Sequence, residues 1–173
     1  MHIISGKYKG KKLKGFDIDG TRPTMDRVKE SVFAMIQGVL PGSKVLDLFS
    51  GSGALGIEAI SNGASKGVLV DNNSISVKTI KENIKNMEDD IEVLNMDYKK
   101  FLKETEDKFD IIFLDPPYRK GLMGKAIRII EERDLLNEGG IIVCEYEVND
   151  FECNLPLWKE KSYGLKKVKI FKK

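Results

Sequence analysis

Residues 109–120 read FDIIFLDPPYRK, an apolar run that stops at an acid, two prolines and an aromatic residue. Proline has no N–H to donate to a strand ladder, so Pro116 and Pro117 should end a strand. Asp115 and Tyr118 would then lie at the carboxyl edge of a sheet, which is where open α/β sheets bind ligands. Taken alone, the four residues fit either a ligand-binding edge or a strand-ending turn and nothing more.

A second chemical motif is the glycine-rich stretch DLFSGSGALG, which stands between a predicted strand and a predicted helix. Gly51, Gly53 and Gly56 have the G-x-G-x-x-G spacing, and Asp71 ends the next predicted strand. Glycines let the backbone approach a ligand, a helix N-terminus offers N–H groups, and Asp71 can accept from two ribose hydroxyls. The pattern predicts a nucleoside cofactor, and NAD or S-adenosylmethionine fits it equally well.

Three features favour S-adenosylmethionine, whose sulfonium is cationic. Asp47 lies within the first strand of this unit, where a carboxylate would be near a cationic ligand. Asp97 ends the third strand and can accept from an adenine amino group, or simply cap the next helix. A dehydrogenase usually needs a second domain for its substrate, and the chain leaves no length for one. The predicted cofactor contacts are Asp47, Ser50, Gly51, Ser52, Gly53, Asp71, Asn72, Met96, Asp97 and Asp115.

The DPPY sequence resembles the catalytic motif of methyltransferases that act on amino groups of nucleic-acid bases. This resemblance implies catalytic roles for Asp115, Pro116, Pro117 and Tyr118. A base amine is a poor nucleophile because its lone pair is delocalised into the ring. Asp115 and the Pro116 carbonyl would each accept one amine hydrogen bond and free the lone pair, while Tyr118 would stack on a flipped base. Such catalysis rests on positioning and electrostatics and needs no metal.

Strands and helices must position these residues, and along most of the chain short apolar runs typical of strands alternate with segments that have the apolar period of a helix. Apolar strands separated by amphipathic helices predict an α/β fold with a mostly parallel sheet covered on both faces. A further helix is predicted to begin with Thr24 as its N-cap. Strands are expected at 44–49, 67–71, 91–97, 109–115 and 139–147, and an antiparallel edge hairpin at 157–173. Helices are expected at 53–63, at 73–87, from the end of the third strand to about residue 104, and at 124–136.

The length of 173 residues fits one domain with a small appendage, here divided into a basic β unit (1–22) and a catalytic domain (23–173). Residues 1–22 carry a net charge of +4 and residues 157–173 carry +6, whereas the remaining 134 residues carry −8. Basic ends on an acidic body suggest a polyanionic partner, although lysine-rich ends can also be merely solvated.

Cysteine usage and hydropathy suggest a reducing, cytoplasmic setting. Cys144, Cys153 and the one histidine are too few for a zinc site of the usual kind, and Cys144 should be a buried thiol. No apolar run approaches the length of a membrane span, and no signal-peptide pattern opens the chain. Nothing in the sequence demands a dimer, so we expect a monomer.

From residue 3 to about residue 147 the chain resembles the ribosomal RNA small-subunit methyltransferase D family, the guanine-N2 methyltransferases. The resemblance rests on IISGKYKGKKL (3–13), RPTMDRVKESVF (22–33), the DLFSGSGALGIEA loop and the D-P-P-[FY] motif. It implies a Rossmann-like class I methyltransferase fold and transfer of a methyl to a specific guanine of 16S rRNA, as RNA or within the small subunit. The RNA contacts that we expect are Lys7, Lys9, Lys11, Lys12, Lys14, Arg22 and Arg27.

Two other functions remain open on the sequence. An adenine-N6 methyltransferase acting on RNA or DNA would use DPPY equally well, and only the N-terminal resemblance argues against it. An RNA-binding protein with a vestigial Rossmann domain is the non-enzymatic alternative, against which the intact glycine loop, Asp71 and DPPY argue.

Overall fold

A seven-stranded sheet with the order β3-β2-β1-β4-β5-β7-β6 forms the centre of the protein. The computed structural model describes residues 1–15, 22–118 and 120–173, with only the backbone described for 22–24. β1 to β5 are parallel, and β7 is antiparallel to both neighbours, β5 and β6. The strands are β1 (Lys44–Asp47), β2 (Lys66–Asp71), β3 (Ile91–Asn95), β4 (Phe109–Leu114), β5 (Leu136–Tyr146), β6 (Leu157–Tyr163) and β7 (Lys166–Lys172).

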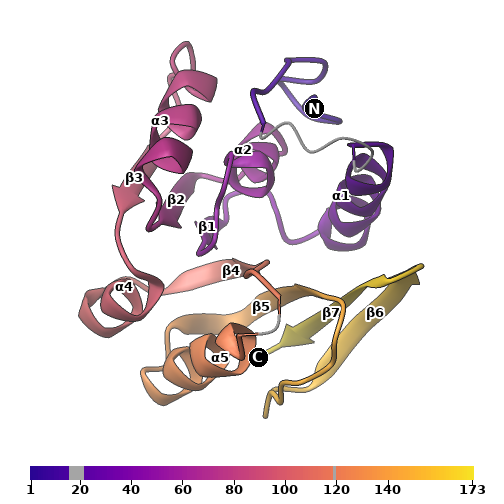
Figure 1. Ribbon diagram of the computed structural model, residues 1–173, viewed down its shortest axis with the longest axis vertical. Coiled ribbons are helices and arrows are strands. Elements are labelled where there is room, and N and C mark those ends of the chain that lie inside the picture. The colour runs from indigo at the N-terminus through magenta and orange to yellow at the C-terminus, as the bar shows by residue number, and fades with distance from the viewer. Residues whose placement is uncertain (16–21, 119) are drawn as a thin grey trace.

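Helices cover both faces of the sheet, as Figure 1 shows, with α1, α2 and α3 on one face and α4 and α5 on the other. Each face has its own apolar cluster, so the predicted α/β fold with an edge hairpin is confirmed. No helix in the described ranges is long and apolar enough to cross a membrane. The helices are α1 (Arg22–Ile36), α2 (Ala54–Ser61), α3 (Ser74–Asn83), α4 (Tyr98–Glu104) and α5 (Leu122–Glu132).

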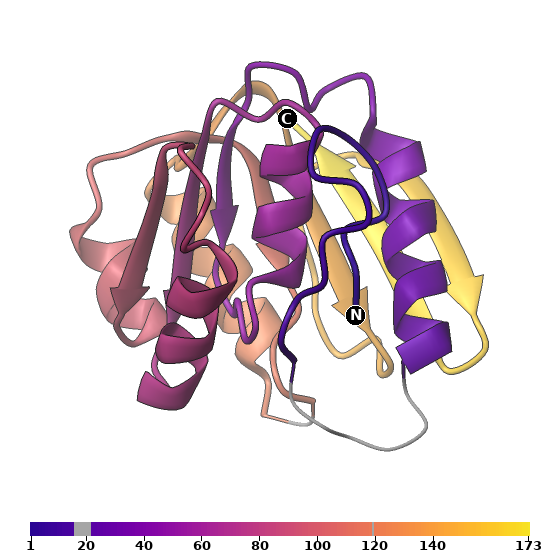
Figure 2. The same cartoon turned by 90° about the horizontal axis from the view of Figure 1, so that it is seen from above.

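The strand order reverses at β1, and this reversal locates the site. The chain moves from β1 outward through β2 to β3, and then returns to place β4 on the other side of β1. The connections after β1 and after β4 therefore leave in opposite directions, which opens a crevice at the carboxyl ends of these two strands. Figure 2 shows the carboxyl ends of the parallel strands at one edge, the lower edge in that view.

The start of α1 differs from the prediction. α1 begins at Arg22, so Thr24 lies within its first turn and is not the N-cap. Pro23 then belongs to the helix instead of breaking the chain before it. A proline in the first turn costs little, because the N–H groups there have no partner within the helix.

The end of α5 also differs, because residues 135 and 136 belong to the strand side of the turn. α5 ends at Glu132 and β5 begins at Leu136, not at residue 139. Asp134 has a φ of +52°, a left-handed conformation that stops the helix. Its carboxylate accepts from the ammonium groups of Lys108 and Lys173 at 2.9 and 2.6 Å, which holds the turn in place.

The first 15 residues form an arm, the N-terminal arm, that packs on α2. Of the predicted β unit, the described residues 1–15 form a bridge between His2 and Lys12 and no strand longer than this. Ile3 and Leu13 are almost fully buried among residues of α2, β2 and α3. The arm is therefore part of the apolar core of this face and not a detached appendage.

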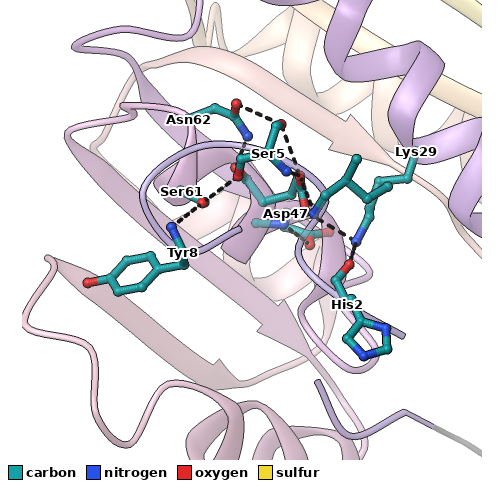
Figure 3. A network of polar contacts seen from close by, with 10 residues as sticks. His2, Ser5, Tyr8, Lys29, Asp47, Ser61 and Asn62 are labelled. Carbon is teal, nitrogen blue, oxygen red and sulfur yellow. Dashed lines mark hydrogen bonds and ion pairs between the residues drawn. The ribbon is translucent and has the colours of Figure 1, made fainter. Parts of the chain in front are cut away.

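A buried carboxylate of α2 fastens the arm to the helices, and Figure 3 shows residues that surround it, among them Ser5 of the arm and Lys29 of α1. Glu58 of α2 has no exposed surface, and its oxygens accept from the backbone N–H groups of Ile4 and Ser5 at 3.0 to 3.1 Å. It also pairs with Lys29 of α1 at 3.2 Å, and Lys29 donates to the His2 carbonyl at 2.9 Å. The arm, α1 and α2 thus meet at one ion pair.

Candidate active site

The loop between β1 and α2 carries the predicted glycine motif at the carboxyl edge. Gly51 and Gly53 have φ values of +54° and +84°, a region that glycine adopts without steric cost. A Cβ on Gly53 would lie 3.1 Å from the side chains of Ile57 and Leu69. The loop therefore lies directly on the core, and Gly51 is its half-buried residue between the buried Ser50 and Ser52.

Two serines of this loop, Ser50 and Ser52, are buried and fix its course. The Ser50 hydroxyl donates to the Val70 carbonyl at 2.8 Å. The Ser52 carbonyl accepts from the Asn83 side-chain amide at 3.0 Å, and the same amide donates to the Lys14 carbonyl at 2.9 Å. The loop is thereby joined to α3 and to the N-terminal arm.

Asp71, at the end of β2, is bound to the glycine loop. Its Oδ2 accepts from the Gly51 N–H at 2.8 Å, and its Oδ1 accepts from the Asn73 N–H at 2.9 Å. Each carboxylate oxygen has two lone pairs, so both can also accept from a ribose hydroxyl. Asn72, also a predicted cofactor contact, is exposed between these residues.

Met96 and Asp97 reach the same edge from the end of β3. The Met96 N–H donates to the Asp71 carbonyl at 3.1 Å, which places Met96 beside the predicted ribose acceptor. Asp97 caps α4, because its Oδ1 accepts from the N–H groups of Lys99 and Lys100 at 2.9 and 3.2 Å. The capping role is thus observed, and the adenine contact stays a prediction.

Asp47 lies beneath the glycine loop with 1% of its surface exposed. Its Oδ2 accepts from the N–H of Gly56 in α2 at 3.0 Å. Burial raises the pKa of Asp47 to about 7, the Gly56 bond opposes this rise, and the nearby charges of Asp71 and Glu145 add to it. A positive charge bound at the loop would therefore favour the ionised form of Asp47.

The DPPY motif lies where β4 ends, as the two prolines predict. Leu114 is the last residue of the strand, Asp115 is half-buried and Pro116 is buried. Pro117 is exposed, and Tyr118 is 36% exposed. The motif therefore presents a carboxylate next to an accessible aromatic face, which is the arrangement that a base would need.

Two charged residues that the sequence analysis missed stand beside Asp115. Leu114 is paired with Cys144, so the following residues Asp115 and Glu145 are neighbours across the β4–β5 ladder. Glu145 is 8% exposed and pairs with Lys166 of β7 at 3.1 Å. An acid within the apolar run IIVCEY was an available signal for Glu145, whereas Lys166 is one of seven lysines in the tail.

The surroundings of Asp115 disfavour its charged form. Its pKa is raised to about 8, first by burial and then by the charges of Glu145 and Asp47, while the Lys166 ammonium opposes this rise. The pKa of Tyr118 is also raised, first by burial and then by the Asp115 charge. Although burial favours a neutral Lys166, the Asp115 and Glu145 carboxylates hold its pKa above the ordinary value.

The residues predicted to bind RNA do not all share one environment. Lys7 is in an ion pair with Asp89, and Lys14 pairs with Glu82 at 2.6 Å, so acids of the body partly neutralise both. Lys9 and Lys12 are exposed, Lys11 is half-exposed, and Arg27 is exposed on α1, while the Arg22 side chain is outside the described residues.

The tip of the arm is remote from DPPY. The Lys7 N–H donates to the carbonyl of Ser61, the last residue of α2, at 2.9 Å. Since α2 starts at the glycine loop, its last residue lies toward the opposite edge of the sheet, as Figure 2 shows. The tip lysines are therefore not beside the DPPY residues.

Comparison with known proteins identifies the family. A family model described as conserved hypothetical protein 95 matches residues 1–172. YlbH of Bacillus subtilis (strain 168) is 39% identical over 100% of this chain and 99% of its own length. The ribosomal RNA small subunit methyltransferase D of Escherichia coli (strain K12) is 34% identical over 95% of this chain and 85% of its own.

A solved structure agrees with these matches. A hypothetical protein of Thermus thermophilus is 28% identical, has a TM-score of 0.83, and is matched over 99% of this chain and 98% of its own. The similarity covers the N-terminal arm, the glycine loop, DPPY and the edge hairpin together. The chain therefore belongs to the ribosomal RNA small subunit methyltransferase D family.

Proposed function

We propose that this protein is an S-adenosylmethionine-dependent methyltransferase that places a methyl group on the exocyclic N2 of a guanine in 16S rRNA. The observation that carries the proposal is the half-buried Asp115 beside the accessible ring of Tyr118, at the edge where the connections after β1 and β4 leave in opposite directions. The family resemblance points to the guanine at position 966 in rRNA numbering. The expected partner is rRNA within the small subunit or an intermediate of its assembly.

The residues at the carboxyl edge fit a cationic nucleoside cofactor. Asp47, Asp115 and Glu145 place three carboxyl groups near the ammonium of Lys166, and a sulfonium bound beside them would favour the ionised forms of Asp47 and Asp115. The glycine loop offers bare backbone, and Asp71 at its edge can accept from ribose hydroxyls. S-adenosylmethionine supplies an electrophilic methyl group when bound, and these residues would hold it.

The chain's own groups then act on the target amine. The Asp115 carboxylate and the Pro116 carbonyl each accept one N–H, which draws the nitrogen toward a pyramidal shape and localises its lone pair. Tyr118 offers its face to the flipped base. Burial of Asp115 removes competing water, so its hydrogen bond to the amine is stronger than it would be in solvent.

The test is methyl transfer to rRNA followed by nucleoside analysis. Unmodified 16S rRNA, alone and within small subunits, is incubated with the protein and methyl-labelled S-adenosylmethionine, then digested to nucleosides. Label in N2-methylguanosine supports the proposal. Label in N6-methyladenosine would establish the adenine-directed alternative, and RNA binding without any transfer would establish the non-enzymatic one.

Cofactor choice gives a first prediction. S-adenosylmethionine or its demethylated product should raise Tm, and NAD should not, because the site is acidic around the position of the sulfonium. A ligand present at about 100 times its Kd stabilises the folded state by roughly 2.7 kcal/mol. Thermal denaturation with each ligand measures this, and stabilisation by NAD alone would contradict the assignment.

A variant of the ribose acceptor sharpens that experiment. Asp71→Ala should weaken cofactor binding about tenfold or more, since the ribose hydroxyls lose a charged acceptor and Gly51 loses the hydrogen bond that shapes the loop. Asp150→Ala, which removes an exposed carboxylate after β5, is the matched control and should bind the cofactor normally. Equal Kd values for the two variants in calorimetry would remove Asp71 from the site.

RNA binding by the N-terminal arm gives a second prediction. The triple variant Lys9→Gln, Lys11→Gln, Lys12→Gln should weaken RNA binding at low salt, because these side chains are point charges suited to phosphates. The slope of log affinity against log salt should become shallower by about 0.7–0.9 for each phosphate that the arm no longer neutralises. Filter binding across a salt series measures it.

The control is a charge-matched change on the other face of the sheet. Lys99, Lys100 and Lys103 are exposed on α4, and changing them to glutamine removes the same charge. That variant should keep the wild-type slope. The arm variant should also methylate the same nucleotide as wild type, since the arm tip is remote from DPPY. Identical slopes for both triple variants would make the arm lysines an ordinary solvated surface.

A further inference from the structure

The strand register gathers four charged residues on one face of the sheet. Phe113, which pairs with Asp47, precedes Asp115 by two residues, and Asp115 follows the Leu114–Cys144 pair that places it next to Glu145. Because side chains alternate along a strand, Asp47, Asp115 and Glu145 all point to the α1–α2 face. Their strands β1, β4 and β5 are consecutive in the sheet.

Lys166 reaches this group from β7, the next strand in the sheet. It lies two residues before Val168, which pairs with Glu145 and faces the same cluster as α1. Its ammonium lies 3.1 Å from Glu145 Oε1 and 5.9 Å from the centroid of the Tyr118 ring. The Lys166 side chain is only 18% exposed and that of Glu145 only 10%, so water screens their charges weakly.

We propose that Lys166, held by Glu145, is a positioning residue that favours the ionised form of Asp115 and holds Tyr118 in place for the base. This inference rests on the proposed function and extends it to the C-terminal hairpin. Lys166 contacts neither cofactor nor methyl group in this role. It acts through two residues of DPPY, one by charge and one by its contact with the aromatic face.

The charges around Asp115 determine whether removing one of them raises or lowers the pKa of Asp115. The groups facing it are Glu145 from β5, Lys166 from β7, Asp47 from β1 and Tyr118 from its own loop. The first three set its charge state near neutral pH. Removing the Lys166 cation should raise the pKa of Asp115 from its value of about 8, and removing the Glu145 anion should lower it.

The experiment follows Asp115 directly by carboxyl ¹³C NMR in the cofactor-bound protein, with the signal assigned by its loss in Asp115→Asn. In Glu145→Gln the titration midpoint should fall. In the double variant Glu145→Gln, Lys166→Met it should rise by about one pH unit or more relative to Glu145→Gln. The Glu145→Gln background matters, because an unpaired Glu145 would otherwise compete with Asp115 for the proton.

The rate of RNA methylation gives an independent second readout. Lys166→Met should lose about tenfold of the single-turnover rate near pH 7 for each unit that the Asp115 midpoint rises, and should regain that rate at alkaline pH. Lys166→Arg should restore the wild-type pH profile. Lys167→Met, the adjacent exposed lysine, is the matched control and should leave the profile unchanged.

The outcomes separate this inference from the proposed function. An Asp115 midpoint that is the same with and without Lys166 overturns the inference, even if wild-type protein methylates guanine. A rate loss in Lys166→Met that is equal at every pH, and that arginine does not rescue, also overturns it. Absence of methyl transfer by wild-type protein would overturn the proposed function, while the NMR titration would still decide whether Lys166 controls the charge of Asp115.

Discussion

Replacing Asp115 by alanine is expected to lower the rate of RNA methylation by about 10²–10³-fold, while the Kd for the cofactor changes only a few-fold. The loss has this size because one hydrogen-bond acceptor, directed at charge that develops in the transition state, is removed from a partly dry site. Single-turnover methylation with saturating RNA isolates the chemical step, and calorimetry measures the cofactor.

The stability of the same variant serves as its control. Since burial raises the pKa of Asp115 to about 8, the folded state binds this proton more tightly than the unfolded chain does. The carboxyl group therefore stabilises the fold at acidic pH and loses this contribution as the pH rises toward 8. Asp115→Ala should not have a lower Tm than wild type at pH 8.

If Asp115→Ala methylates RNA at the wild-type rate, the DPPY motif is only a strand-ending turn.

Replacing Glu58 by alanine should cause the largest loss of stability of any change considered. Glu58 is fully buried, accepts from the backbone of Ile4 and Ser5, and neutralises the buried ammonium of Lys29. Breaking a buried ion pair by removing one partner costs about 3–5 kcal/mol, which corresponds to roughly 6–20 °C in Tm for a chain of this size. Thermal unfolding followed by circular dichroism measures the change.

Two further variants separate the ion pair from the backbone anchor. Glu58→Leu combined with Lys29→Met removes both charges and should recover only part of the loss, because the N–H groups of Ile4 and Ser5 stay without their acceptor. Glu82→Gln removes an exposed partner of Lys14 and should leave Tm almost unchanged. A Glu58→Ala protein as stable as Glu82→Gln would show that the arm is held by its apolar contacts alone.

The sheet was predictable because its signals are local. Short apolar strands alternate with amphipathic helices from Lys44 onward, and the prolines after Leu114 stop β4 where ladder geometry requires it. The glycine loop and Asp71 were predictable for a similar reason. Both follow strands whose carboxyl ends must meet at one edge, and the structure joins them by the Gly51–Asp71 hydrogen bond.

The errors occurred where local pattern and tertiary contact disagree. Leu135 and Leu136 continue the apolar period of α5, but a left-handed Asp134, held by two lysines from distant segments, ends the helix before them. Thr24 has the residue type of an N-cap, yet the helix begins at Arg22. In both cases the helix itself was predicted, but the position of its end was wrong.

Lys166, the cationic neighbour of Asp115, could not be found from sequence spacing. Lys166 reaches Glu145 only because β7 runs antiparallel beside β5, and that pairing depends on which strand of the hairpin takes the inner position. The arm shows the same limit, since ion pairs with Asp89 and Glu82 set Lys7 and Lys14 apart from Lys9, Lys11 and Lys12. Both are long-range pairings in a lysine-rich sequence that offers many alternatives.

The inner position of β7 also determines when the sheet can be completed during synthesis of the chain. β6 pairs only with β7, and β7 is the strand that joins it to β5. As the chain emerges from its N-terminus, β6 has no neighbour to pair with, and the edge of β5 stays open until β7 follows. Because β6 joins the sheet through β7, the final step of sheet assembly comes after β7 has been synthesised.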